Sequence, residues 1–319
     1  MFENGKVWMK GFDAYYEAEL KNIEASIERS RLAALAEFKR RAVISVPAAA
    51  VLSAPAFYLL GPLGLIALGA LLYAAYKYYV SLPAKEFEET MENDAYASIS
   101  TFFGLEYEAE PTLSSLRNYS GTNTLPPHDR SQYKNGRTGS YQNVLVSIIH
   151  AHLEQFDKKD KDYDTRFKGT LRCFSFPKSF AGTTIIHPDR SALGNRLSKS
   201  KSSLSRIRIE DQEFEQYFVV LGSDQVESRY ILSPDFITRF MKLMDILGPD
   251  FTVKFEDSMM MIYYSDQTEI ESSPFSIAEL DYFMGNIDAK KLVGNMIHDT
   301  SVIFEIIETL NLTSTTKAS

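Results

Sequence analysis

One stretch of the chain, from Ala42 to Tyr76, carries no charged side chain. As a single helix it would extend about 52 Å at ~1.5 Å per residue, too long for one crossing of a hydrocarbon core about 30 Å thick. Gly61-Pro62 interrupts the stretch, and this pair is typical of one helix ending and another beginning, because Gly favours the residue after a helix and Pro its first turn. We therefore predict a transmembrane helical hairpin over residues 42–80, with spans at 42–60 and 63–80.

The basic residues around this hairpin predict its orientation. Lys39-Arg40-Arg41 precedes it and Lys77 and Lys85 lie at its end, whereas the turn between the spans has no Lys or Arg. Cytoplasmic flanks of membrane helices are enriched in these residues, so both termini and the soluble remainder are expected in the cytoplasm. Two alternatives are a buried hairpin of a soluble protein and a re-entrant hairpin. With either membrane-inserted form of the hairpin, we expect the lipid bilayer to be a partner of this chain.

Helices are predicted on both sides of the hairpin. Residues 1–41 predict an amphipathic helix, because Tyr16, Leu20 and Ile23 recur at helical spacing. This stripe has two interpretations: a coiled-coil seam that would make a homo-oligomer, or packing against the protein's own soluble domain. Residues 81–104 predict a helical stalk that ends at Gly104.

The remainder, residues 105–310, predicts a cytoplasmic α+β domain with a mainly antiparallel sheet, followed by a flexible tail at 311–319. Its strands cluster, and its helices come late, as expected for this class. Leu113–Ser140 is rich in Ser, Gly, Asn and Pro and predicts a long loop or a partly extended segment. The remaining predicted elements are strands at 141–153, 166–176, 183–187, 206–209, 217–221, 229–232, 251–255 and 259–264, a helix at 234–247, a capping box at 276–279 and a final helix at 288–310.

Composition excludes two broad classes of function. The net charge of −8 argues against nucleic-acid binding, which requires concentrated Lys and Arg. The single cysteine, Cys173, can form neither an intramolecular disulfide nor a thiolate cluster, and it suits a reducing compartment. We interpret it as a small buried side chain.

Several motifs resemble those of a bacterial domain-of-unknown-function family, number thirty-one thirty-seven. They are Phe167-Lys168-Gly169, Phe176-Pro177-Lys178, the run Gly182–Ile186, Glu213-Phe214-Glu215 and, above all, the run Ser223–Pro234. The resemblance spans about Tyr141 to Tyr264. It implies a membrane-anchored protein of a bacterial inner membrane, and it implies no catalytic residue.

Metal and cofactor motifs are incomplete. His150-Ala151-His152 places two imidazoles on one face of a strand, but a zinc site needs three or four ligands, and only His187 offers another. Asp160-x-Asp162-x-Asp164 resembles the start of a calcium loop, yet Thr165 and Leu171 stand where that loop requires Gly and Glu. We expect no metal and no cofactor, with His150 and His152 as the weak candidates.

The leading functional hypothesis is a non-enzymatic module that binds a protein partner or anionic lipid headgroups. The chain has no phosphate-binding glycine loop and no GxSxG nucleophile motif. The candidate headgroup contacts are basic: Lys199, Lys201, Arg206 and Arg208.

The alternative is an enzyme of an unrecognised type. Its site would be built from residues brought together by the fold: His150, His152, His187, Asp224 or Glu227. Asp224 and Glu227 also have a structural interpretation. In it, Asp224 caps a turn, and the nearby Arg229 fixes the register of a strand at 230–232.

Overall fold

The computed structural model describes residues 5–112, 125, 128–159, 161–189, 204–265, 283–285 and 288–313. The chain divides into two compact units. Residues 1–98 with 274–296 form the first, and residues 99–273 with 297–319 form the second. The described part of the first is helical, and the second contains the sheet.

The N-terminal helix begins later than predicted. A 3₁₀ turn at Val7–Met9 precedes Gly11, whose φ of +82° breaks the chain direction, and α1 then starts at Phe12 (Phe12–Tyr15). A π turn leads into α2 (Lys21–Leu60), which continues without interruption from the amphipathic segment into the apolar one. The two segments that differ in composition are therefore parts of a single helix.

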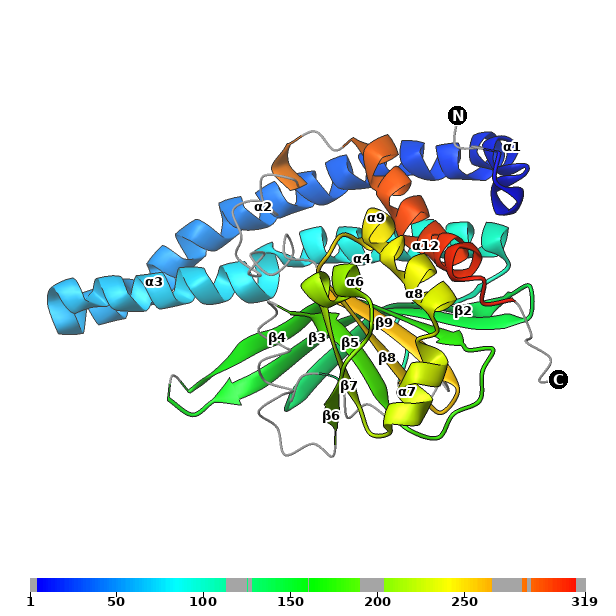
Figure 1. The fold of residues 1–319 in the computed structure, drawn as a ribbon. Helices are drawn as coiled ribbons and strands as arrows, with labels where there is room; N and C mark the ends of the chain where they lie inside the picture. Colours follow the sequence, from blue (N-terminus) through cyan, green and yellow to red (C-terminus); the bar gives the residue numbers. More distant parts are fainter. Residues whose placement is uncertain are drawn as a thin grey trace. The chain divides into compact units, whose positions relative to one another are not determined.

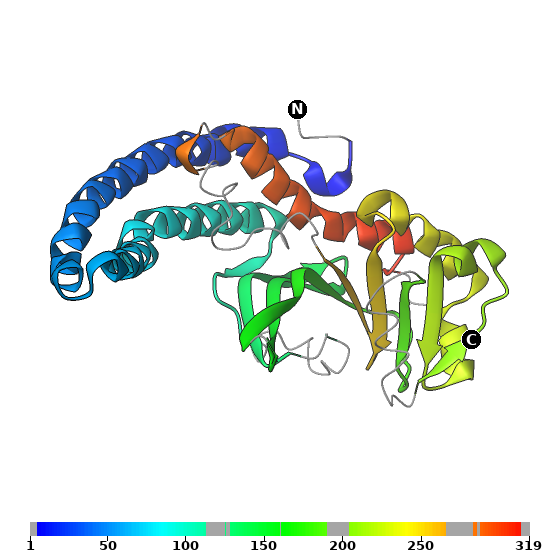
Figure 2. The same ribbon diagram turned by 90° about the vertical axis from the view of Figure 1, so that its left-hand side faces the viewer.

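The helical hairpin turns where the sequence predicts. α2 ends at Leu60, Gly61–Leu63 forms a 3₁₀ turn, and α3 (Gly64–Ala75) runs back through a π turn to α4 (Leu82–Phe103). Figure 2 shows α2, in blue, turning back into α3. A Cβ on Gly64 would lie 2.7 Å from backbone atoms of Phe57, so only glycine permits this close approach of the two helices.

The surface of this hairpin is apolar and open. Val43, Leu52 and Ile66 are 72%, 67% and 70% exposed. Two helical stretches, Val7–Leu59 and Gly61–Phe103, each contain a segment long and apolar enough to cross a membrane by length and composition, and the second of these stretches includes α3. A core helix of a soluble protein would bury such side chains, since each would gain about 1.5–3 kcal/mol by leaving water.

The second unit contains an antiparallel sheet of nine strands, so the predicted α+β class is confirmed (Figure 1). The strand order is β1-β2-β3-β4-β9-β8-β5-β7-β6. The strands are β1 (Glu106–Glu108), β2 (Arg130–Tyr141), β3 (Val144–Asp157), β4 (Asp162–Ser175), β5 (Thr184–Pro188), β6 (Ser205–Ile207), β7 (Phe218–Gly222), β8 (Phe251–Glu256) and β9 (Met259–Ser265).

The two faces of the central strands bury different residues. Because side chains alternate along a strand, Ile149, Leu171 and Cys173 share one face, in an apolar cluster with Met261 and Tyr263. One face of the methionine-rich strand β9 therefore lies in the core. The opposite face lies against the last helix, α12 (Ala289–Leu310), whose Phe304 packs 4.8 Å from Tyr141 between ring centroids.

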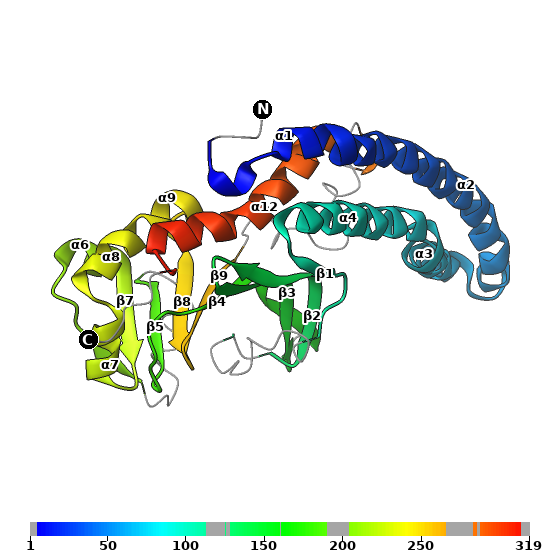
Figure 3. The ribbon, with the colours of Figure 1, turned by 90° about the vertical axis from the view of Figure 1, so that its right-hand side faces the viewer.

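Short helices gather beside β7 and β8 (Figure 3). These are α6 (Gln212–Tyr217), α7 (Gln225–Ile231), α8 (Pro234–Met241) and α9 (Leu243–Leu247). Phe240 of α8 lies 5.3–5.7 Å from the rings of Phe214, Phe218 and Phe251. The aromatic cluster fastens these helices to the end of the sheet.

The structure decides between two predicted alternatives and shows that another prediction is wrong. Residues 130–140, which belong to the segment predicted as a long loop or partly extended, are extended in strand β2, whose backbone pairs with β3 over ten residues although its side chains are mostly polar. The predicted strand at 229–232 lies in helix α7. There Asp224 is the N-cap, and its carboxylate accepts hydrogen bonds from the backbone N–H of Val226 and Glu227. The predicted capping box at 276–279 lies outside the described residues.

This correction changes what substitutions in α7 should do. Asp224→Ala removes the cap and should lower the free energy of unfolding by about 1 kcal/mol. Arg229→Ala should change it little, since Arg229 forms no ion pair within the described part of the chain and sets no strand register. Urea unfolding of both variants tests this. Asp224→Asn is the matched control, because Asn caps helices as well as Asp does. An Arg229→Ala loss as large as that of Asp224→Ala would contradict the helical interpretation.

Candidate functional site: a buried polar cluster and a helical groove

The most extensive buried polar cluster of the described chain centres on Asp299 of α12. Its Oδ1 lies 2.5 Å from Nη2 of Arg172 in β4, and its Oδ2 lies 2.8 Å from Nη1 of Arg137 in β2. Both arginines are completely buried, while 18% of the Asp299 side chain is exposed. Nε2 of His150 in β3 lies 3.0 Å from Oδ2 of Asp299. Three strands and one helix therefore converge on a single carboxylate.

Further hydrogen bonds fix the two guanidinium groups. Nη1 of Arg137 donates to Oγ1 of Thr300 at 2.8 Å, and Nη1 of Arg172 donates to the hydroxyl of Tyr264 at 2.7 Å. Nη2 of Arg172 also donates to the backbone carbonyl of Asp299 at 2.9 Å. The cluster thus joins side chains of the sheet to both the backbone and the side chains of α12.

The cluster keeps Asp299 ionised. Burial by itself opposes the charged form, but Arg137, Arg172 and His150 outweigh it and hold the pKa of Asp299 well below its usual range. A carboxylate whose two oxygens both accept charge-assisted hydrogen bonds is a poor general base, because its proton affinity is low. The arrangement suits a structural connection between α12 and the sheet better than acid–base catalysis.

The other two candidate histidines, His152 and His187, have different surroundings. Nε2 of His152 lies 2.9 Å from Oγ1 of Thr165, and burial lowers the pKa of His152. Nδ1 of His187 donates to the carbonyl of Pro188 at 3.1 Å, and burial likewise lowers the pKa of His187. Within the described ranges, no three His, Cys, Asp or Glu side chains lie close enough to hold a metal ion.

The acidic candidates support local backbone structure. Asp224 caps α7, and Glu227 accepts hydrogen bonds from the backbone N–H of Ala181 at 3.2 Å and Gly182 at 2.6 Å. These partners differ from those of His150, His152 and His187. The five residues of the enzymatic alternative are therefore each held by their own neighbours.

The remaining candidates lie apart from the cluster. Cys173 is buried, and burial raises the pKa of its thiol to about 12, which disfavours the nucleophilic thiolate. Arg206 and Arg208 are exposed, in and just after β6. Lys199 and Lys201 lie outside the described residues. Headgroup contact by this basic segment stays a prediction.

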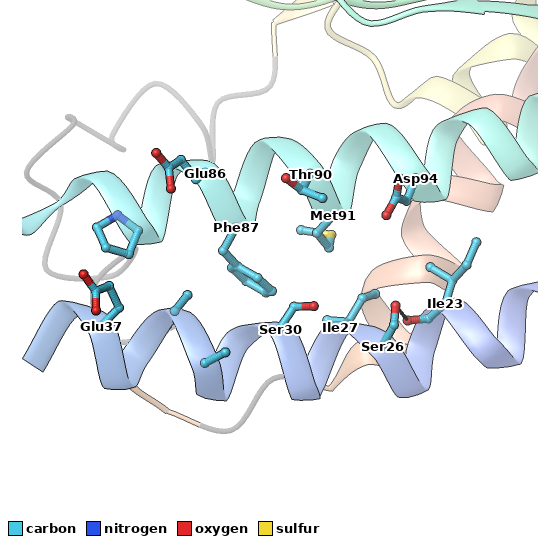
Figure 4. A pocket seen from close by; sticks show the side chains of 13 residues that line it. Ile23, Ser26, Ile27, Ser30, Glu37, Glu86, Phe87, Thr90, Met91 and Asp94 are labelled. Carbon is cyan, nitrogen blue, oxygen red and sulfur yellow. Dashed lines mark hydrogen bonds between the residues drawn. The ribbon is translucent and has the colours of Figure 1, made fainter.

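A second feature, in the helical unit, is a groove of about 400 Å³ between α2 and α4 (Figure 4). Its floor contains the buried side chains of Ile27, Phe87 and Met91. Ile23 adds a further apolar side chain, and the rest of the lining is small, polar or acidic: Ser26, Ser30, Ala33, Ala34, Glu37, Pro83, Glu86, Thr90 and Asp94. The groove is open because α2 presents Ser and Ala where a larger side chain would fill the space between the helices.

A comparison with known protein families tests the family resemblance that the motifs predict. Residues 165–312 match the family described as "Protein of unknown function (DUF3137)". The resemblance to this family is confirmed. The matched DUF3137 region begins later than the predicted range and extends through α12, so it includes both Arg172 and Asp299.

Other comparisons add little to this. No curated protein sequence matches the chain. Among solved structures, the crystal structure of the mycobacterial trehalose monomycolate transport factor A, TtfA, aligns with a TM-score of 0.37 and 11% identity. The alignment covers 68% of this chain and 95% of that one.

Sequence reasoning missed most of the Asp299 cluster. Arg137 lies in a polar stretch rich in Gly and Ser, where an arginine is normally exposed, and Asp299 lies on a helix whose sheet-facing side cannot be aligned with particular strands from sequence alone. Arg172 carried the available signal. In a strand that alternates, it falls on the face opposite to Leu171 and Cys173, and the structure buries that face too, so its guanidinium group needs polar partners. For α7 the signal was Asp224 followed by Glu227, the spacing of a capping box.

Proposed function

We propose that this chain is a membrane-anchored module that binds a partner and catalyses no reaction. The observation that supports anchoring is the exposed apolar surface of α2 and α3, including Val43, Leu52 and Ile66. Lys39-Arg40-Arg41 and Lys77 flank this surface, which favours cytoplasmic termini and a cytoplasmic sheet domain. The arrangement around Asp299 favours a binding role over catalysis, because both oxygens of its carboxylate are already held by buried arginines.

Alkaline carbonate extraction of native membranes tests the anchor. The full chain should stay in the pellet. A Leu52→Arg/Leu71→Arg variant should move to the supernatant, since both residues lie near the middle of a predicted span and each charge at the centre of a span costs about 2.5–3.5 kcal/mol. The matched control is Val226→Arg/Tyr230→Arg, which alters two exposed apolar side chains of α7. Release of the wild-type chain by carbonate would refute the anchor.

Labelling tests the orientation. In a Cys173→Ser background, a single cysteine at Leu63, which is exposed in the turn, should react with a membrane-impermeant maleimide added from outside the cytoplasmic membrane. A cysteine in place of Gly5 should react only after the membrane is permeabilised. The reverse pattern would place the sheet domain on the outer side.

A further inference from the structure

We propose that the groove between α2 and α4 binds a basic amphipathic helix of a partner protein. This names a partner class for the binding function proposed above and rests on it. The groove is partly open, and it has an apolar floor and walls formed by α2 and α4 (Figure 4).

The length of the groove corresponds to that of a short helix. The α2 wall extends from Ile23 to Glu37, which corresponds to roughly 21 Å, or about four turns, at ~1.5 Å per residue. Ser30 and Ala33 have short side chains, so the backbone of a third helix can approach the wall closely while its apolar side chains reach Phe87 and Met91. An apolar stripe three to four turns long is the complementary shape.

The charge of the lining selects the partner. All three ionisable residues that line the groove are acids: Glu37, Glu86 and Asp94. Glu37 is paired with Arg40 and Arg41, and these hydrogen bonds lower its pKa to about 2. Glu86 and Asp94 are exposed and form no ion pair within the described residues, which leaves two carboxylates on α4 for cations of a partner.

These carboxylates disfavour two other occupants. Anionic lipid headgroups would be repelled by Glu86 and Asp94, and the groove lining offers no Lys or Arg to attract them. A second copy docked by two-fold symmetry would place two acidic groove linings against each other, because such an interface is made by the same surface on both subunits. An amphipathic helix that carries Lys or Arg can place apolar side chains on the floor of the groove and cations beside Glu86 and Asp94.

The position of the groove also favours a basic helix as the partner. Its Glu37 and Pro83 end lies within a few residues of the apolar hairpin that starts at Ala42. Segments next to the cytoplasmic ends of membrane helices are enriched in Lys and Arg. A membrane protein beside this one would therefore present a segment of suitable charge at the right level.

A model peptide tests the proposal on the full chain in phosphatidylcholine nanodiscs, which cover the apolar hairpin. The probe is a fluorescent 18-residue peptide with leucine at helical spacing and lysine at the other positions, and its binding is measured by fluorescence anisotropy against empty nanodiscs. We expect saturable binding that weakens roughly tenfold in Glu86→Lys/Asp94→Lys. The matched control, Glu19→Lys/Glu89→Lys, changes the net charge equally at exposed acids of the same helical unit outside the groove and should bind within about twofold of wild type.

A photo-crosslinking experiment uses the wild-type protein, so its result does not depend on whether the variants fold. A benzophenone on the leucine face of the peptide should crosslink to residues 23–37 and 83–94. Absence of binding, equal loss in the two double variants, equal binding of a leucine–glutamate peptide, or crosslinks confined to other segments would each overturn the proposal. Carbonate extraction reports on the membrane anchor separately, so failure of the groove leaves that test unaffected.

Discussion

Replacing Asp299 by Ala is expected to lower the free energy of unfolding by about 3–5 kcal/mol, because Arg137 and Arg172 are completely buried and would lose their shared counter-charge. Both guanidinium groups would then face each other with no carboxylate between β2, β4 and α12. Urea unfolding of the full chain in detergent, followed by circular dichroism of the sheet, measures this loss. The control is Asp235→Ala, whose carboxylate is 79% exposed and pairs with Arg239 on the surface, and which should change stability little.

A triple variant separates charge from packing. Arg137→Met/Arg172→Met/Asp299→Leu removes the whole cluster and should recover most of the stability lost in Asp299→Ala, since apolar groups can replace a complete buried ion network at little cost. An Asp299→Ala protein as stable as wild type would show that the cluster does not connect α12 to the sheet.

The same cluster predicts a dependence on pH. The pKa of Asp299 is lowered in the folded protein, so the stability that it contributes is fully present above the unfolded pKa of about 3.9 and is lost as pH falls through the folded pKa. The stability difference between wild type and Asp299→Asn should therefore be constant from neutral pH to about pH 4 and shrink in stronger acid. A difference that already shrinks between pH 7 and pH 5 would contradict the lowered pKa.

Phe240→Ala should be similarly damaging, with a loss of about 3–5 kcal/mol in the free energy of unfolding. Its ring is fully buried against Phe214, Phe218 and Phe251, so truncation leaves a cavity between α8 and the sheet that rigid neighbours cannot fill. Phe240→Leu keeps most of the volume and should cost about 1–1.5 kcal/mol.

Tyr230→Ala, at a half-exposed ring of α7, is the surface control for this cavity and should cost much less. Thermal unfolding of the three variants, read by circular dichroism, gives the ranking. Equal losses in Phe240→Ala and Phe240→Leu would mean that the site collapses around any smaller side chain.

Much of the architecture follows from the sequence because its signals are local. A charge-free run with Gly61-Pro62 near its middle predicts two apolar helices and the turn between them, and the structure has both. The β-branched and aromatic strands also follow from alternation. β8, for example, begins at the predicted Phe251 and extends one residue past the predicted end. Where strand and helix signals overlapped, as at 229–232, the N-cap of Asp224 prevailed over β-branched composition.

Long-range partners were decided only by the tertiary structure. Arg137, His150, Arg172 and Asp299 are separated by up to 162 residues, and nothing in their local patterns specifies that one carboxylate of α12 meets two arginines of the sheet. The groove likewise exists only because α2 and α4 lie side by side. Ser30 of α2 lines it together with Thr90 of α4, and nothing in the sequence around Ser30 predicts that neighbour. Local composition determines which segments are apolar or extended, whereas the pairing of distant charges and the spaces between helices depend on packing that no single segment encodes.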